Sequence, residues 1–275
     1  MASLCLKRLA KERERFTTDD SEFWVAWNDT NLRAFTAYII GPVDSVYAYK
    51  LIKLRFDIPD QYPFIPPKVK FIQHTGDRLH PNLYVDGKVC LSILGTWSGP
   101  GWSQNMNVEC VLRSIRSLLD QQPYTYEPGQ SDRPEFNAYV RFHGWRWLLL
   151  DYLERDTEGE AKAWLEKYLA KYGSNMIVEL ERQRDEARRG GAGTTMSNPY
   201  ARNARHTVDY ERLISDLKKH IPHAVEPPLS SLVPAGVAME DARVKRKLPF
   251  ETAPPFAAAG SESPAKKPCV VVDLE

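Results

Sequence analysis

The sequence predicts an α+β fold in which a four-stranded antiparallel meander is accompanied by helices, and two periodic segments carry this prediction. Residues 50–58 alternate apolar and charged side chains, with Ile52, Leu54 and Phe56 on one face, as in a half-buried strand. Residues 108–119 place their apolar side chains at helical spacing instead. An amphipathic helix of this kind must pack on an apolar surface such as the sheet.

The first helix and the four strands are expected in order along residues 3–73. Residues 3–16 predict a helix with leucines on one side and a charged face on the other. Short β-prone segments separated by turn residues predict strands at 23–27, 32–40, 50–58 and 68–73. Prolines interrupt regular structure before the last strand: Pro59, Pro63, Pro66 and Pro67. Because the connections are short, a meander is the economical topology.

Helices are expected beyond residue 130. Pro134 suits the first turn of a helix that Asp132 caps and that runs to residue 150. Helical composition returns over residues 157–189 and 208–219. The residues between them, 189–200, begin with a glycine-rich run and look like a linker.

Three segments are therefore expected. Residues 1–155 form the main folded domain, and residues 156–222 form a helical extension. Residues 223–275 are rich in Pro, Ala, Ser and Lys, which predicts a largely disordered tail. Tryptophans in or near the extension favour its packing on the main domain: Trp145, Trp147 and Trp164.

Composition excludes several classes of protein. Hydrophobic residues make up 43% of the chain, which is ample for a core, and 37 Lys and Arg against 36 Asp and Glu give no reason to expect nucleic acid or an anionic membrane as partner. The N-terminus becomes charged at Lys7 and no segment has eighteen uninterrupted apolar residues, so we expect a soluble intracellular protein. The four cysteines show no paired spacing, which argues against a disulfide framework and a structural zinc site.

The stretch from residue 80 to 103 has the character of a site. It is irregular, lies between the last strand and the amphipathic helix, and holds Cys90 eight residues after the triplet His80-Pro81-Asn82. A lone cysteine is most often a small buried hydrophobe, so the pattern around Cys90 has to carry any functional interpretation.

Several motifs stand in a fixed order around this stretch. They are Ile40-Gly41-Pro42 at the end of a strand, Tyr62-Pro63-Phe64-Ile65-Pro66-Pro67, His80-Pro81-Asn82, Cys90-Leu91-Ser92-Ile93-Leu94, and Trp102-Ser103 before the amphipathic helix. In this order and spacing, about the first 150 residues resemble the ubiquitin-conjugating enzymes. An insert at 95–101, the run Glu127-Pro128-Gly129 after Pro123-Tyr124, and the long extension resemble the large Z-type members.

The resemblance implies a ubiquitin-conjugating (UBC) fold and a thioester mechanism. Cys90 would accept the C-terminus of ubiquitin from an activating enzyme and pass it to a lysine amine or a ligase. Asn82 would either donate to the oxyanion that forms during transfer or order the loop. His80 and Pro81 would set the loop, and neither is expected to act as a base. Glu127, Tyr126 or Asp120 would activate the incoming lysine, with Glu127 named first.

Partner surfaces are implied in the same way. Lys7, Arg8 and Lys11 would face the activating enzyme, although a merely solvated helix face is the plainer interpretation of their charges. The apolar pair Phe64 and Ile65 would enter a ligase groove. The second ligase loop, at Ser103 and Gln104, departs from the family, which usually has Pro where Gln104 stands.

The tail carries a separate hypothesis. Val270, Val271, Val272, Asp273 and Leu274 resemble a SUMO-interacting motif, in which an apolar run adds a strand to SUMO and acidic residues meet its basic rim. Basic clusters at 243–247 and 266–267 serve either nuclear import or tail solubility, so nucleus and cytoplasm are the expected locations.

No cofactor or metal is expected, because ATP is used by the activating enzyme. One alternative is a conjugating enzyme for another ubiquitin-like modifier. Another is an inactive UBC-like scaffold that only binds ubiquitin, but such variants lack the cysteine and commonly the His-Pro-Asn triplet, and both are present here.

Overall fold

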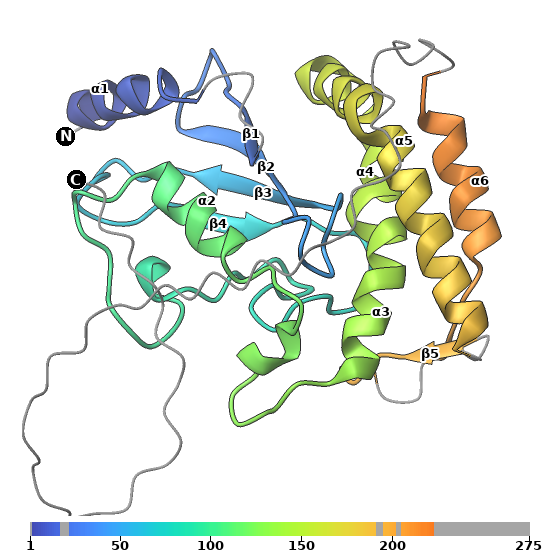
Figure 1. Ribbon diagram of the computed structural model, residues 1–275. Coiled ribbons are helices and arrows are strands. Elements are labelled where there is room, and N and C mark those ends of the chain that lie inside the picture. Colours follow the sequence, from blue (N-terminus) through green and yellow to red (C-terminus); the bar gives the residue numbers. More distant parts are fainter. Residues whose placement is uncertain (1, 17–21, 191–194, 202–204, 223–275) are drawn as a thin grey trace, which may run out of the picture. The chain divides into compact units, whose positions relative to one another are not determined.

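The computed structural model describes residues 2–16, 22–190, 195–201 and 205–222. These residues belong to one compact unit, Met1–Pro222, and Figure 1 shows its elements. The expected tail, 223–275, lies outside the described residues together with its SUMO-type motif. Among the described residues, no helix combines the length and the apolar character that crossing a membrane requires.

The predicted meander is confirmed. Four antiparallel strands pair in chain order: β1 (Phe23–Ala26), β2 (Ala34–Ile40), β3 (Leu51–Asp57) and β4 (Lys68–Phe71). Ala37 lies opposite Leu54, and Phe56 lies opposite Val69. This register places the alternating apolar residues of β2 and β3 on one face, where they are buried.

The buried face of the sheet packs against two helices and forms the first core. α1 (Ala2–Arg13) contributes Cys5 and Leu9, and α2 (Val108–Arg116) contributes the apolar stripe predicted from its spacing. Asn107 begins α2 by accepting a hydrogen bond from the backbone N–H of Cys110 at 2.8 Å. The helix ends before Leu118 and Leu119, which stay buried in the turn that follows.

A second core forms where the extension covers part of the opposite face. α3 (Pro134–Trp145) continues through a π-helical turn, Arg146–Leu150, into α4 (Asp151–Arg155). α5 (Gly159–Arg189) and α6 (Tyr210–His220) lie beside α3 at one end of the sheet (Figure 1). Trp164 stacks on Trp24 with centroids 5.0 Å apart, and Tyr38 and Leu51 join the same core. Residues 1–155 and 156–222 thus fold as parts of one unit.

Two local expectations are wrong. Arg133, not Asp132, precedes the first turn of α3, because Asp132 instead accepts a hydrogen bond from the Asn137 side chain at 2.7 Å. The expected linker is also partly structured: β5 (Thr195–Ser197) pairs with β6 (Arg205–Thr207), and Tyr200 between them packs on the first core. An aromatic anchor gives this segment apolar surface to bury, which its glycine-rich start conceals.

Candidate active site

Cys90 and Asn82 are joined by two reciprocal hydrogen bonds. The backbone N–H of Cys90 donates to the Asn82 carbonyl oxygen, and Asn82 Nδ2 donates to the Cys90 carbonyl oxygen, each at 2.9 Å. A bridge between Leu83 and Val89 closes the loop between them. Asn82 and Cys90, for which the resemblance implies separate roles, are thus in direct contact, and of the two roles expected for Asn82 this contact favours the loop-ordering one. One of the two N–H donors of the amide is committed to it.

The thiol of Cys90 is free but covered. Cys90 forms no disulfide, and only 1% of the residue is exposed. Thr96, from the insert, bonds to the residues before and after Cys90. Thr96 Oγ1 donates to the Val89 carbonyl at 2.6 Å and accepts from the Leu91 N–H at 2.9 Å. The insert at 95–101 therefore begins by holding the loop segment that carries Cys90.

His80 is a structural imidazole in this arrangement. Its Nδ1 accepts from the backbone N–H of Asn82 at 2.9 Å, so the proton lies on Nε2, which donates to the Leu118 carbonyl at 3.0 Å. Burial lowers the pKa of His80 to about 4, and the positive charge of Arg78 acts in the same direction. The ring is therefore neutral near pH 7 and ties the Asn82 loop to the end of α2.

Of the three candidates for lysine activation, two contact each other, and the third contacts Tyr200 instead. Tyr126 donates its hydroxyl to Asp120 Oδ2 at 3.0 Å. Glu127 Oε2 accepts from the hydroxyl of Tyr200 at 2.7 Å and lies 3.7 Å from Arg78. No sequence pattern indicated a role for Tyr200, because this residue lies in the segment that was expected to be a linker. The role of Glu127 stays a prediction.

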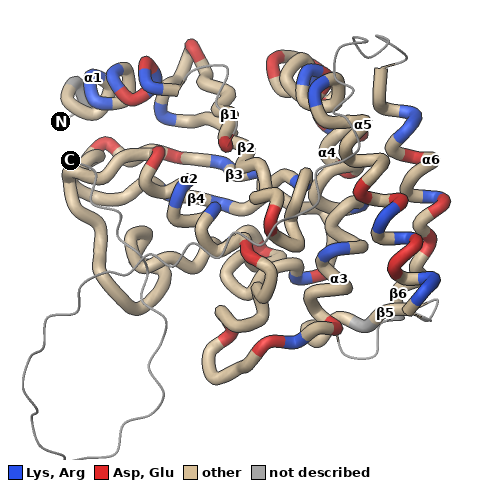
Figure 2. The backbone as a smooth tube through the Cα atoms, viewed as in Figure 1, with Lys and Arg blue, Asp and Glu red and all other residues tan. Residues whose placement is uncertain are grey.

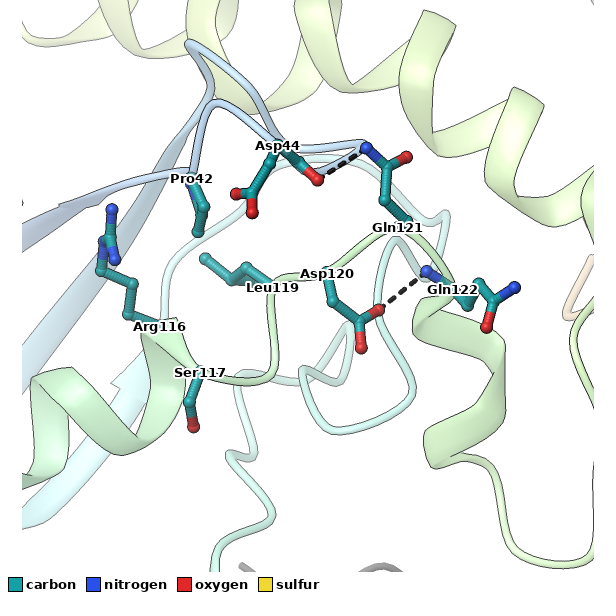
Figure 3. A pocket seen from close by; sticks show the side chains of 8 residues that line it. All are labelled: Pro42, Asp44, Arg116, Ser117, Leu119, Asp120, Gln121 and Gln122. Carbon is teal, nitrogen blue, oxygen red and sulfur yellow. Dashed lines mark hydrogen bonds between the residues drawn. The ribbon is translucent and has the colours of Figure 1, made fainter. Parts of the chain in front are cut away.

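An open pocket of about 430 Å³ lies beside Asp120 at the end of α2 (Figure 3). Asp44 and Asp120 come to it from different loops, and Gln121 crosses between the loops by donating to the Asp44 carbonyl at 2.6 Å. Within the described part of the chain, no group of three or more His, Cys, Asp or Glu side chains is placed to hold a metal ion.

The three basic residues of α1 that are predicted to face the activating enzyme differ in their contacts within the protein. Figure 2 shows both signs of charge along α1, where Lys7 and Lys11 are exposed. Arg8 is engaged internally, since it pairs with Glu12 at 2.6 Å and donates to the Met106 carbonyl at 3.1 Å. Lys7 and Lys11, by contrast, form no ion pair with the part of the chain that the structure describes.

The two predicted ligase loops lie together. Phe64 and Ile65 are 55% and 42% exposed, although both are apolar. Trp102 Nε1 donates to the Pro63 carbonyl at 2.7 Å, which brings the exposed Ser103 and Gln104 beside that pair. The tertiary structure thus assembles one surface from two distant segments.

The fold and the site together define the class of protein. A cysteine that is hydrogen-bonded to an asparagine stands on a loop between a four-stranded meander and the helix that follows it. Residues 8–138 match the family model for ubiquitin-conjugating enzymes, and the chain belongs to this family.

Within the family, the chain is similar to ubiquitin-conjugating enzyme E2 Z. It is 36% identical to the Danio rerio protein over 193 residues, which cover 66% of this chain and 57% of that protein. It is 31% identical to the Homo sapiens protein over 228 residues, which cover 78% of this chain and 62% of that one. The Mus musculus dual E2 ubiquitin-conjugating enzyme/E3 ubiquitin-protein ligase BIRC6 is 30% identical over 259 residues, or 83% of this chain and 5% of that one. The chain therefore spans about three fifths of the length of the E2 Z proteins, and these matches reach beyond the family-model region.

Proposed function

We propose that this chain is an active ubiquitin-conjugating enzyme. The thiolate of Cys90 attacks the carbonyl carbon of ubiquitin's thioester with the activating enzyme, a new C–S bond replaces the old one, and the departing cysteine takes up a proton. A lysine amine, or a ligase cysteine, then attacks the Cys90 thioester. A new C–N bond, or a new C–S bond to the ligase, forms as the C–S bond to Cys90 breaks. Cys90 leaves as a thiolate, and the amine nitrogen gives up a proton to that thiolate or to water. No cofactor of this chain is needed, because exchange between thiols is nearly balanced and ATP acts in the activating enzyme.

The observation that carries the proposal is the reciprocal pair of hydrogen bonds between Asn82 and Cys90. It holds the backbone of the nucleophile in one geometry. It also keeps the Asn82 amide next to the backbone of Cys90, so that ordering of the loop is the role we propose for this asparagine.

The test is a charging assay with activating enzyme, ATP and ubiquitin. Wild type should form an adduct that thiol reductants remove, and Cys90→Ala should form none. Cys110→Ala is the matched control and should charge like wild type, since that thiol is only half-buried and stands on α2. A Cys90→Ala protein that still forms the adduct would refute the proposal. Running the assay with other ubiquitin-like modifiers decides between ubiquitin and the alternative modifiers, and failure with all of them favours the inactive scaffold.

For its partners, we propose that α1 meets the activating enzyme through Lys7 and Lys11, with Arg8 supporting the helix. Phe64 and Ile65, with Ser103 and Gln104, form the ligase surface. Phe64→Ala should charge at the wild-type rate but lose ligase-stimulated discharge. Slower charging with normal ligase response would contradict this division of surfaces.

We propose further that the tail binds SUMO through Val270, Val271, Val272, Asp273 and Leu274. The support is the sequence pattern alone, an apolar β-prone run followed by acid. SUMO binding that survives deletion of 270–275 would exclude it.

For location we propose the nucleus and the cytoplasm, because the tail carries basic clusters at 243–247 and 266–267. We propose no nucleic-acid or membrane partner, because the net charge of the chain is only +1. Imaging of a chain with residues 243–247 neutralised tests the nuclear part.

A further inference from the structure

The hairpin that follows α5 returns to the loop that precedes the candidate nucleophile. Asn198 donates through Nδ2 to the Arg78 carbonyl at 3.1 Å, and His206 Nε2 lies 3.6 Å from Asp77 Oδ1. Two contacts from a segment more than a hundred residues away therefore fix the approach to His80. The hairpin is a structural neighbour of the active-site loop.

Tyr200, between the two strands of this hairpin, is seated in an aromatic pocket. Its ring lies 5.6 Å from the Tyr124 ring and 5.5 Å from the Phe136 ring, measured between centroids. Its hydroxyl donates to Glu127 at 2.7 Å. Burial raises the pKa of Tyr200 above its ordinary value, and the carboxylate of Glu127 adds to the shift, so the hydroxyl stays a donor throughout the physiological range.

Arg78 connects Tyr200 to the loop around Asn82. The centre of its guanidinium lies 3.7 Å from the ring centroid of Tyr84 and 4.5 Å from that of Tyr200, so two aromatic rings pack near it. The same guanidinium donates to the Pro81 carbonyl. Pro81 immediately precedes Asn82, and Tyr84 follows it on the way to Cys90. Arg78 thus holds the loop before and after the asparagine.

We propose that Tyr200 is a positioning residue of the transfer reaction, which acts through Arg78 and Glu127 to fix the loop that carries Asn82. This inference rests on the proposed conjugating activity. Without Tyr200, Arg78 loses one of its two ring contacts and Glu127 loses its hydroxyl donor. The guanidinium is then free to turn from Pro81, and the Asn82 side chain loses its fixed place beside the Cys90 thioester.

The experiment separates charging from discharge in the full chain. Wild type, Tyr200→Ala and Tyr200→Phe are charged with ubiquitin, the activating enzyme is stopped by removal of ATP, and the thioester is discharged on free lysine at several concentrations. Tyr200→Ala should charge normally but discharge about tenfold more slowly at saturating lysine. Its KM for lysine should be unchanged, because Tyr200 touches no substrate. Tyr200→Phe keeps the ring on Arg78 and should lose only about threefold.

Two further variants distinguish positioning from general loss of structure. Tyr210→Ala removes another aromatic side chain of the extension, one that packs on Phe142 at 4.8 Å, and should discharge normally. Arg78→Gln should slow discharge, and adding Tyr200→Ala to it should slow discharge only about threefold more rather than tenfold, because the ring contact with Arg78 is already lost and only the contact with Glu127 remains to be removed.

The outcomes are distinct. A wild-type chain that does not charge overturns the proposed function and this inference with it. A wild-type chain that charges, alongside a Tyr200→Ala chain that charges and discharges at the same rates, overturns the inference alone. Equal loss in Tyr200→Ala and Tyr210→Ala also overturns it, since the effect would then be one of stability.

Discussion

Lys50 lies inside the second core and forms no ion pair with any part of the chain that the structure describes. Its Nζ donates to the Val46 and Ala48 carbonyls at 3.1 and 3.4 Å and lies 4.3 Å from the centroid of the Trp145 ring. Gly144 makes room for its stem, since a Cβ there would lie 2.6 Å from Lys50 Cδ. Burial lowers the pKa of Lys50 to about 7, and the charge of Glu179 opposes this shift without cancelling it.

Lys50 should make stability rise with pH above neutrality. Between its folded pKa of about 7 and its unfolded value of 10.5, the unfolded chain binds more protons, so the free energy of unfolding increases with pH. We expect a gain on the order of 3 kcal/mol from pH 7 to 9.5 that Lys50→Met lacks. Urea unfolding at several pH values measures it. Lys68→Met, at an exposed lysine of β4, should keep the gain; equal slopes in wild type and Lys50→Met would contradict the prediction.

At the scale of elements, one carboxylate joins α1 to two other parts of the fold. Glu12 is only 3% exposed, although its place on the charged face of α1 predicts a solvated side chain. Its Oε1 accepts from Arg8 and from the hydroxyl of Tyr62, each at 2.6 Å. Its Oε2 accepts from the backbone N–H of Val108 at 3.0 Å, where the positive end of the α2 dipole favours a negative charge.

Glu12→Gln should therefore destabilise the protein by about 3 kcal/mol, because it keeps the shape but leaves Arg8 without its counter-charge in a mostly buried site. Chemical denaturation monitored by tryptophan fluorescence measures the change. Glu14→Gln, exposed just beyond the same helix, is the matched control and should stay within about 0.5 kcal/mol of wild type. A Glu12→Gln protein as stable as this control would show that the carboxylate carries no such role.

At the scale of the whole molecule, the extension completes the core of the unit. α5 and α6 supply much of the second cluster, against Tyr38 and Leu51 of the sheet: Leu165, Tyr168, Leu169, Met176, Leu180, Leu213, Ile214 and Leu217. Removing these helices would expose that face to water, at about 25 cal/mol for each Å² of apolar area.

A chain that ends at residue 222 should keep the full chain's stability, whereas one that ends at residue 155 should be markedly less stable or insoluble. Thermal unfolding of the three chains tests this. Equal melting of the chains ending at 155 and 222 would show that the extension is a separate body.

Trp164→Ala, in the full chain, should lower the free energy of unfolding by about 2 kcal/mol, because the stack on Trp24 is lost.

The sequence by itself determined what depends on neighbours along the chain. The two-residue period of β3 and the helical spacing of α2 fix which faces are buried, and both were predicted. The spacing of Asn82 and Cys90 also sufficed to bring them together, because they stand on either side of one short loop. The cap of α3 shows the limit, since Asp132 had a second local partner in Asn137.

Only the tertiary structure decided the contacts between distant segments. Tyr200 and Glu127 are 73 residues apart, and Glu12 and Val108 are 96 apart, and no local pattern marks either pair. Burial of a lysine at position 50 and of a glutamate in a charged helix face likewise depends on what folds over them. Periodicity reports which side of an element faces the core, but the partner of a polar side chain is set by the packing of whole elements. That packing is what placed the hairpin around Tyr200 against the loop that leads to Cys90.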